Sequence, residues 1–282
     1  ATGTGITGGD PMLDFEKTVL AIIELKKAFG DDHHIHCYTS IPIKPEQAMK
    51  LGESGLDELR FHLLDLSLER YTESVNAAHE AGITVGIELP AEPDKEEKLM
   101  KLLSELDSSV VEFLNLNELE ITIGNQENMD VRGFNLAGGI TAAAEGSAEL
   151  ATKLKKAAEG MSFHVKFCTA NFKDAGQLRN RFRRRGEATL RPYEVLSDDD
   201  TILFGAIPCP LEYASDDVKE LSETLGLMDG WIRYDASNQR IEIPLSAAED
   251  VAEHLNVPVQ MIEVHPTHER LEVGLIHLNE LR

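Results

Sequence analysis

The sequence contains few cysteines and few basic side chains. Its three cysteines, Cys37, Cys168 and Cys209, lie far apart and form no Cys-x-x-Cys pair. This spacing fits a protein of the reducing cytoplasm, and it excludes a complete cysteine-built metal site within these residues. The 27 Lys and Arg residues are outnumbered by 50 Asp and Glu, which gives a formal charge of −23. We therefore expect no general DNA binding, because affinity for a phosphate backbone comes largely from basic side chains.

The sequence also lacks a long apolar run and an initial methionine. No run approaches the roughly 18–20 apolar residues that a membrane span needs. The first residues have neither the basic nor the apolar part of a secretion signal. We therefore expect a cytoplasmic protein without a membrane partner. Hydrophobic residues make up 42% of the chain, which is enough for a sizeable core and excludes a disordered acidic tail.

Strand and helix patterns alternate through the first two-thirds of the chain. Short apolar runs predict strands at Gly3–Gly9, His34–Thr39, Leu59–Leu64, Ile83–Leu89, Val110–Leu116 and Phe163–Cys168. Amphipathic runs predict helices between them, at Phe15–Phe29, Glu46–Leu51, Tyr71–Ala81, Lys95–Leu106 and Ser147–Ala158. This alternation indicates parallel β/α units. The sequence therefore predicts an α/β fold, with a partial (β/α) barrel over residues 1–186.

A different pattern follows over residues 187–282. Strands are predicted at Thr189–Val195, Thr201–Ile207, Trp231–Tyr234, Arg240–Pro244, Gln260–His265 and Arg270–His277. Two predicted helices, Asp216–Leu225 and Ala247–Leu255, interrupt these strands. Short turn signals between neighbouring strands indicate antiparallel hairpins. We expect a small α+β accessory domain that selects the substrate.

Polar residues follow the predicted strands of the barrel. The chemistry of β/α barrels takes place at the C-terminal ends of their strands. The polar positions there are Thr7, Asp10, Tyr38, Thr39, Ser40, Asp65, Glu88, Asn115, Asn117, Glu118, Cys168 and Thr169. One polar strand end is ordinary, because chains turn polar where they leave a sheet. The collective pattern indicates a ligand site.

The segment Gly3–Pro11 carries the strongest motif. Gly8 and Gly9 let backbone groups approach a ligand without a Cβ in the way. Asp10 offers an acceptor to an ammonium group, and Pro11 stiffens the exit from the turn. A glycine-rich turn between a strand and a helix also suits a phosphate. The negative charge of Asp10 favours a cationic ligand group instead.

Gly8-Gly9-Asp10-Pro11 at the end of a barrel strand resembles the GGE(P) motif of radical S-adenosylmethionine (SAM) enzymes, with Asp10 where Glu is commoner. Residues 83–90 are similar to the fifth-strand region of that superfamily, whose neighbourhood contacts adenine. Residues 114–120 and 167–174 are similar to an archaeal-type group of uncharacterised radical SAM proteins. That group is related to the activating enzyme of pyruvate formate-lyase. The resemblance covers most of the chain and is strongest over residues 1–180.

The resemblance implies a set of SAM-binding residues. The amino group of the methionine moiety would be bound by Gly8, Gly9, Asp10 and Pro11. Contacts with ribose, carboxylate or adenine would come from Thr39, Ser40, Glu88 and Asn117. The implied reaction is reductive cleavage of SAM at a [4Fe–4S] cluster, which gives a 5′-deoxyadenosyl radical that abstracts hydrogen from an unknown substrate. That substrate would be a protein, an RNA or a small molecule, and a ferredoxin or flavodoxin would donate the electron.

The sequence departs from the family at the cluster motif. Radical SAM enzymes hold the cluster through Cys-x-x-x-Cys-x-x-Cys, and none of the three cysteines has this spacing. Either the chain is an N-terminally truncated fragment, with cluster cysteines upstream of Ala1, or it is a degenerate homologue that has lost the cluster. A start inside a strand favours the fragment. We expect no metal ligands within these residues, and an inactive protein when they stand alone.

Two other functions fit the same sequence. One is a phosphate-binding β/α-barrel enzyme without a cluster, which would use Gly3–Gly9 as its anion loop. The other is a non-enzymatic RNA-binding module that uses the basic run Arg179–Arg185, conspicuous in so acidic a chain. The ordinary explanation of these arginines is a solvated helix end, where cations are favoured by the helix dipole.

Overall fold

The computed structural model describes residues 2–139, 141–254 and 256–279, and the chain forms two compact units. The units divide between Phe172 and Lys173. The sequence places the domain boundary between residues 186 and 187, which lies inside α7 (Arg179–Thr189). α7 belongs to the second unit because Arg179 and Arg183 form ion pairs with Asp200 there. Such a contact between distant residues leaves no signal in hydrophobic periodicity.

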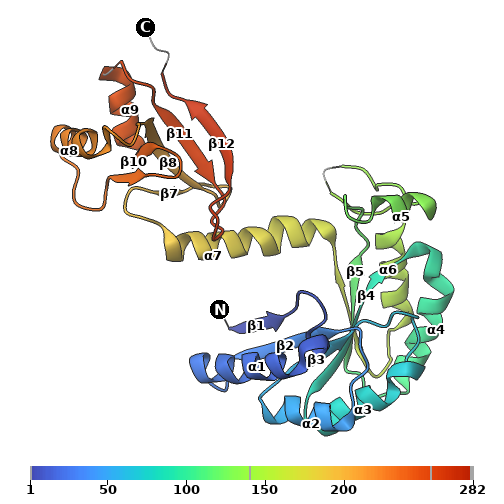
Figure 1. Ribbon diagram of the computed structural model, residues 1–282. Coiled ribbons are helices and arrows are strands. Elements are labelled where there is room, and N and C mark those ends of the chain that lie inside the picture. Colours follow the sequence, from blue (N-terminus) through green and yellow to red (C-terminus); the bar gives the residue numbers. More distant parts are fainter. Residues whose placement is uncertain (1, 140, 255, 280–282) are drawn as a thin grey trace. The chain divides into compact units, whose positions relative to one another are not determined.

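The first unit is a parallel sheet with helices between its strands (Figure 1). Its six strands pair in the order β1-β2-β3-β4-β5-β6, and every neighbouring pair is parallel. The elements are β1 (Gly3–Ile6), α1 (Phe15–Phe29), β2 (His34–Thr39), α2 (Pro45–Glu53), β3 (Glu58–Phe61), α3 (Thr72–Glu80), β4 (Thr84–Ala91), α4 (Glu96–Asp107), β5 (Phe113–Glu118), α5 (Gln126–Val131), α6 (Ser147–Ala157) and β6 (His164–Cys168). This arrangement confirms the predicted α/β fold class with a partial β/α barrel.

The two faces of this sheet have opposite character. Alternate residues of a strand point to opposite faces, and one set, including Ile35, Phe61 and Ile87, is buried in the main apolar core. Right-handed crossovers between consecutive parallel strands place the helices over this face. The other face carries Tyr38 and Arg60 among its polar side chains. A closed barrel fills its interior with layers of apolar side chains, so this polar face is suited to a ligand instead.

The segment between β5 and α6 contains α5, a helix that the sequence did not predict. Its base is fixed by Ser147, whose hydroxyl accepts from the backbone N–H of Leu119 and donates to the carbonyl of Ala91, both at 2.8 Å. Arg132 at the end of α5 forms ion pairs with Glu92 and Asp94, which follow β4. The segment is therefore held beside the C-terminal ends of β4 and β5.

The second unit is an antiparallel sheet with helices. A π-helical segment, Phe172–Leu178, leads into α7. The strand order is β12-β11-β8-β10-β9, with β7 paired to β8, and all pairs are antiparallel. The remaining elements are β7 (Val195–Leu196), β8 (Ile202–Pro208), α8 (Ala214–Leu225), β9 (Arg233–Asp235), β10 (Arg240–Ile243), α9 (Leu245–His254), β11 (Gln260–Val264) and β12 (Glu272–His277). The predicted small α+β domain is confirmed.

One predicted strand is wrong. Thr189–Val195 is not a strand, because Thr189 closes α7 and only Val195–Leu196 pairs with β8. Pro192 in this stretch has no N–H to donate to a sheet. The predicted end of the helix at Leu255 lies outside the described residues. Within the described ranges, no helix is long and apolar enough to cross a membrane.

Candidate functional site

The turn after β1 exposes backbone acceptors. Gly8 and Gly9 have φ values of +92° and +57°, a conformation that residues with a Cβ rarely adopt. No atom lies within 4 Å of the position that a Cβ would take at either glycine. Backbone conformation, rather than crowding, therefore requires glycine here. Both residues are exposed, and no hydrogen bond from any described residue reaches their carbonyl oxygens.

Asp10 fixes this turn to the end of β2. Its Oδ1 accepts from the backbone N–H of Met12 at 3.0 Å and from the hydroxyl of Thr39 at 2.8 Å. Its Oδ2 accepts from the backbone N–H and the hydroxyl of Ser40, at 2.7 and 2.9 Å. A carboxylate offers about four lone-pair sites, so protein donors occupy all of them. Pro11 follows at the first position of the 3₁₀ helix Pro11–Asp14, where its missing N–H costs nothing.

These hydrogen bonds set the ionisation of Asp10. Burial by itself disfavours the carboxylate, but the N–H groups of Ser40 and Met12 and the hydroxyls of Thr39 and Ser40 donate to the charged form. Together they hold the pKa of Asp10 below its ordinary value. Asp10 is therefore a negative charge beside the Gly8–Gly9 turn at neutral pH.

Glu88 is the centre of a second polar cluster, on the open face of β4 and β5. Its Oε2 accepts from Arg60 Nη1 at 2.9 Å and from Asn115 Nδ2 at 3.3 Å. Its Oε1 accepts from Asn117 Nδ2 at 3.0 Å. These bonds turn the amide nitrogens of both asparagines toward Glu88. The amide oxygen of Asn117 is left as an acceptor, because no described group donates to it.

Arg60 is held between two aromatic rings on the same face. Its guanidinium lies 5.1 Å from the ring centre of Tyr38 and 5.6 Å from that of Phe113. It donates to the Tyr38 hydroxyl at 2.8 Å and forms an ion pair with Glu58. Gly86 makes room for this stack, since a Cβ there would lie 2.0 Å from the Phe113 ring. Burial opposes the charge of Arg60, but the bond to Glu58 and the nearby acidic groups raise its pKa overall.

A chain of contacts joins the two clusters across β3. The Tyr71 hydroxyl donates to the carbonyl of Ser40 at 2.8 Å and lies 3.4 Å from the carbonyl of His62. His62 Nδ1 lies 3.1 Å from the backbone oxygen of Glu88. The eight predicted site residues therefore form two sets along one edge of the sheet. One is Gly8, Gly9, Asp10, Pro11, Thr39 and Ser40, and the other is Glu88 and Asn117.

The prediction from sequence missed Arg60, and it noted Tyr38 and Asn115 as polar strand-end residues without assigning them a role. A signal for Arg60 was present, because a charged residue inside an otherwise apolar strand needs a partner when it is buried. Further polar strand ends stay outside the clusters, among them Cys168, which is half-buried at the end of β6. Asp65 is exposed, and Glu118 accepts from the backbone N–H of Ala170 at 2.7 Å, which fixes the loop after β6.

The cysteines do not form a metal site. Cys37 is buried on the helix-covered face, where burial and the nearby charge of Asp10 raise the pKa of its thiol to about 12. Cys209 belongs to the second unit, where burial and Asp217 raise its thiol pKa to about 11. Across the described ranges, no group of three or more His, Cys, Asp or Glu side chains is arranged to hold a metal ion. The residues present here do not fit a [4Fe–4S] cluster.

The basic run on α7 is partly engaged within the second unit. Asp200 is buried and forms ion pairs with Arg183 at 2.7 Å and Arg179 at 3.1 Å. These arginines hold the pKa of Asp200 below its ordinary value. Arg179 and Arg183 therefore attach α7 to the turn before β8. This internal role weakens the case for an RNA-binding surface built on the whole run.

Comparison with known proteins gives a relative along nearly the whole chain. No family model matches the sequence. A protein of Methanocaldococcus jannaschii is described as a "putative glycyl-radical enzyme activating enzyme". It is 34% identical to this chain over an alignment 292 residues long, which covers 98% of this chain and 76% of the relative. Among solved structures, 3-hexulose-6-phosphate synthase from Salmonella typhimurium matches 62% of this chain and 79% of its own, with 16% identity and a TM-score of 0.34, which is too weak to indicate a shared fold. The chain therefore belongs to the same family as the Methanocaldococcus jannaschii activating enzyme, a radical SAM family.

Proposed function

We propose that this chain is the SAM-binding part of a radical SAM enzyme that activates another protein. The observation that carries the proposal is the Gly8–Gly9 turn, whose two carbonyl oxygens accept from no described residue and lie beside the ionised Asp10 at the end of a parallel strand. The name of the relative supports the reaction class and a protein substrate. When bound, SAM supplies a sulfonium whose reductive cleavage starts radical chemistry.

The electron-transfer half of that chemistry needs groups from elsewhere. The three cysteines do not fit an iron–sulfur cluster, so cluster ligands would have to come from residues outside these 282. An electron donor such as a ferredoxin or flavodoxin would complete the system. We place this system in the cytoplasm, where the three unpaired cysteines stay reduced.

The turn after β1 would hold the ammonium group of SAM. Its two carbonyls accept hydrogen bonds, while the four acceptor sites of Asp10 are already filled by protein donors. Asp10 would therefore act mainly by fixing the turn and by adding negative charge beside the ammonium. Thr39 and Ser40 would contribute as donors to Asp10. This differs in detail from a direct ammonium–carboxylate bond, which the motif alone suggests.

The Glu88 cluster would hold the adenosine half. Glu88 orients Asn117 so that its amide oxygen accepts from a ribose hydroxyl or the adenine amino group. Arg60 and Asn115 keep Glu88 in place from the other side. The polar open face then leaves room for the reacting part of the substrate beside these strands.

A binding experiment tests this division into two halves. Methionine and 5′-methylthioadenosine are titrated separately into the 282-residue chain by calorimetry, and then SAM. We expect Gly9→Ala to weaken the binding of methionine and of SAM. We expect Asn117→Ala to weaken the binding of 5′-methylthioadenosine and of SAM. Asp65→Asn is the matched control, since Asp65 lies at the same sheet edge outside both clusters. Absence of SAM binding, or equal effects of the control, would contradict the proposal.

The DNA sequence upstream of Ala1 tests whether the natural protein carries the cluster-binding cysteines. We expect the codons that precede Ala1 in the natural gene to encode Cys-x-x-x-Cys-x-x-Cys. A longer chain with those cysteines, reconstituted anaerobically with iron and sulfide, should cleave SAM when reduced. An upstream region without the motif would rule out the radical reaction while leaving SAM binding by the 282-residue chain open to the calorimetric test.

A further inference from the structure

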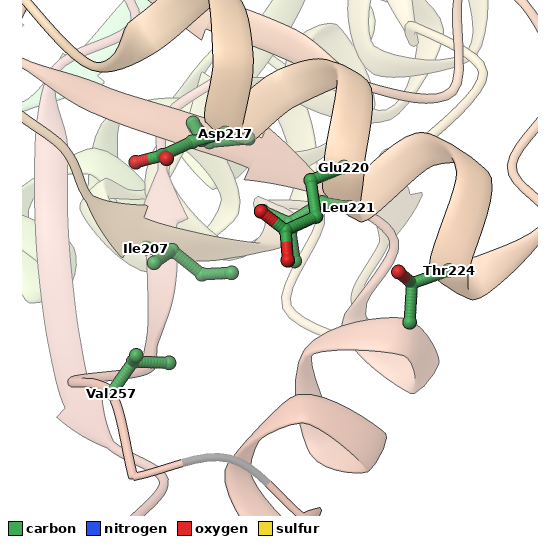
Figure 2. Close-up of a pocket in the computed structure, with 7 residues that line it drawn as sticks. Ile207, Asp217, Glu220, Leu221, Thr224 and Val257 are labelled. Carbon is green, nitrogen blue, oxygen red and sulfur yellow. The ribbon is translucent and has the colours of Figure 1, made fainter.

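A cavity of about 260 Å³ lies in the second unit between α8 and the sheet. It is lined by Ile207, Asp217, Glu220, Leu221, Thr224, Ile241 and Val257. Figure 2 shows the carboxylates of Asp217 and Glu220 on the helix side of the cavity, with Ile207 and Val257 across from them. All these residues belong to the second unit, so the cavity is separate from the candidate SAM site.

The sheet side of the cavity is aliphatic. Ile207 of β8 and Ile241 of β10 face each other in register, and both are buried in the core of this unit. Val257, which follows α9, completes this wall. Such a wall stabilises an aliphatic chain by removing its surface from water.

The helix side of the cavity is acidic. α8 packs on the core through Ala214, Val218, Leu221 and Leu225. Asp217, Glu220 and Thr224 follow one another at spacings of three and four residues, which brings them to one flank of the helix beside the cavity. Asp217 lies in the first turn of α8, where the helix dipole favours a carboxylate, and Glu220 and Thr224 are exposed beside the cavity.

These two carboxylates have no cationic partner. Asp217 Oδ2 lies 3.3 Å from the Cys209 thiol, which donates to it. Within the described parts of the chain, neither Asp217 nor Glu220 forms an ion pair. The cavity therefore combines an aliphatic wall with two uncompensated negative charges.

We propose that this cavity binds one long cationic side chain, arginine or lysine, from a basic segment of a partner protein. The aliphatic stem packs on Ile207 and Ile241, and the charged end lies between Asp217 and Glu220. The volume corresponds to roughly eight or nine water molecules at about 30 Å³ each, which is the size of one long side chain. It lies below the range of about 300–1,000 Å³ that is usual for whole small-molecule ligands. A net charge of −23 also draws basic partners toward the chain.

Capped tripeptides provide the test. Acetyl-Gly-Arg-Gly-amide and its lysine counterpart are titrated into the full 282-residue chain, labelled with ¹³C at the isoleucine methyl groups. We expect saturable shifts of the Ile207 and Ile241 methyl signals. Glu220→Gln should weaken binding about fivefold, the effect of one exposed ion pair of about 1 kcal/mol. Glu223→Gln, on the same helix but outside the cavity lining, should leave binding unchanged.

Each comparison has an outcome that overturns the proposal. A norleucine tripeptide that binds as well as the arginine peptide would show that the carboxylates recognise no charge. Free agmatine that binds more tightly than both cationic peptides would identify a small amine as the ligand instead. Equal losses in Glu220→Gln and Glu223→Gln would show a general charge effect. The Glu220 side chain makes no hydrogen bond or ion pair with another described residue, so the variant should fold, which circular dichroism checks.

Discussion

Replacement of Asp10 by Asn is expected to destabilise the first unit by about 2 kcal/mol. The Asn oxygen can still accept from the Met12 N–H and so retain the cap of the 3₁₀ helix. In the wild type the Ser40 N–H lies 2.7 Å from Oδ2 of Asp10, which accepts from it. In the variant the Asn NH₂ group would take the place of this oxygen. Two donors would face each other, and a donor without an acceptor costs about 1–3 kcal/mol. The two hydroxyl partners add little, because they can rotate toward other acceptors.

The pH dependence of this loss has a definite sign. The folded-state pKa of Asp10 is lowered, so its charged form stabilises the native state. That contribution is fully present above the unfolded pKa of about 3.9 and is lost as pH falls through the lower folded value. The stability difference between the wild type and Asp10→Asn should therefore be constant above about pH 5. It should shrink below about pH 4.

Urea unfolding followed by far-ultraviolet circular dichroism measures the change, and amide hydrogen exchange locates it. The single tryptophan, Trp231, lies in the second unit, so its fluorescence would report the other half of the chain. A loss of about 2 kcal/mol corresponds to roughly 30-fold faster exchange at Ser40. Asp14→Asn is the matched control, since Asp14 is exposed and caps nothing with its side chain. Unchanged exchange at Ser40 would refute the assigned role of Asp10.

Three further predictions concern single side chains. Gly9→Ala should lower the free energy of unfolding by only about 1 kcal/mol, because the cost is backbone strain alone. Gly86→Ala should lower it by more than twice as much, because the new Cβ would overlap the Phe113 ring. Thermal unfolding of both variants compares the two losses. Arg60→Met should destabilise the first unit by about 3 kcal/mol in urea, since it leaves acidic partners without their cation in a largely buried cluster. Asp200→Asn should accelerate proteolysis within α7, and cleavage at the wild-type rate would show that its arginine pairs do not hold the helix.

The sequence predicted most of the first unit because local signals agreed there. α1 and β2 begin and end where they were predicted, at Phe15–Phe29 and His34–Thr39. Helical periodicity, a glycine after the helix and strict alternation in the strand all point the same way. α5 (Gln126–Val131) was missed because its two apolar residues, Met129 and Val131, are two positions apart and form no helical pattern. Its position depends on Arg132 and Ser147, which are distant contacts.

The candidate site was predictable in its position but not in its connections. Asp10, Thr39 and Ser40 were each selected as polar strand ends, yet their mutual hydrogen bonds follow from the parallel pairing of β1 with β2. Arg60 was overlooked because it lies inside a strand, where its side chain reaches Glu88 across β3 and β4. Strand register decides such contacts, and register is a property of the folded sheet.

The strands of the first unit divide two tasks between alternate residues. In β3, Leu59 and Phe61 support the core, while Arg60 between them belongs to the polar face. A substitution at Leu59 or Phe61 therefore removes apolar contacts from the core, whereas one at Arg60 removes the cation that holds Glu88 and leaves the core packing in place.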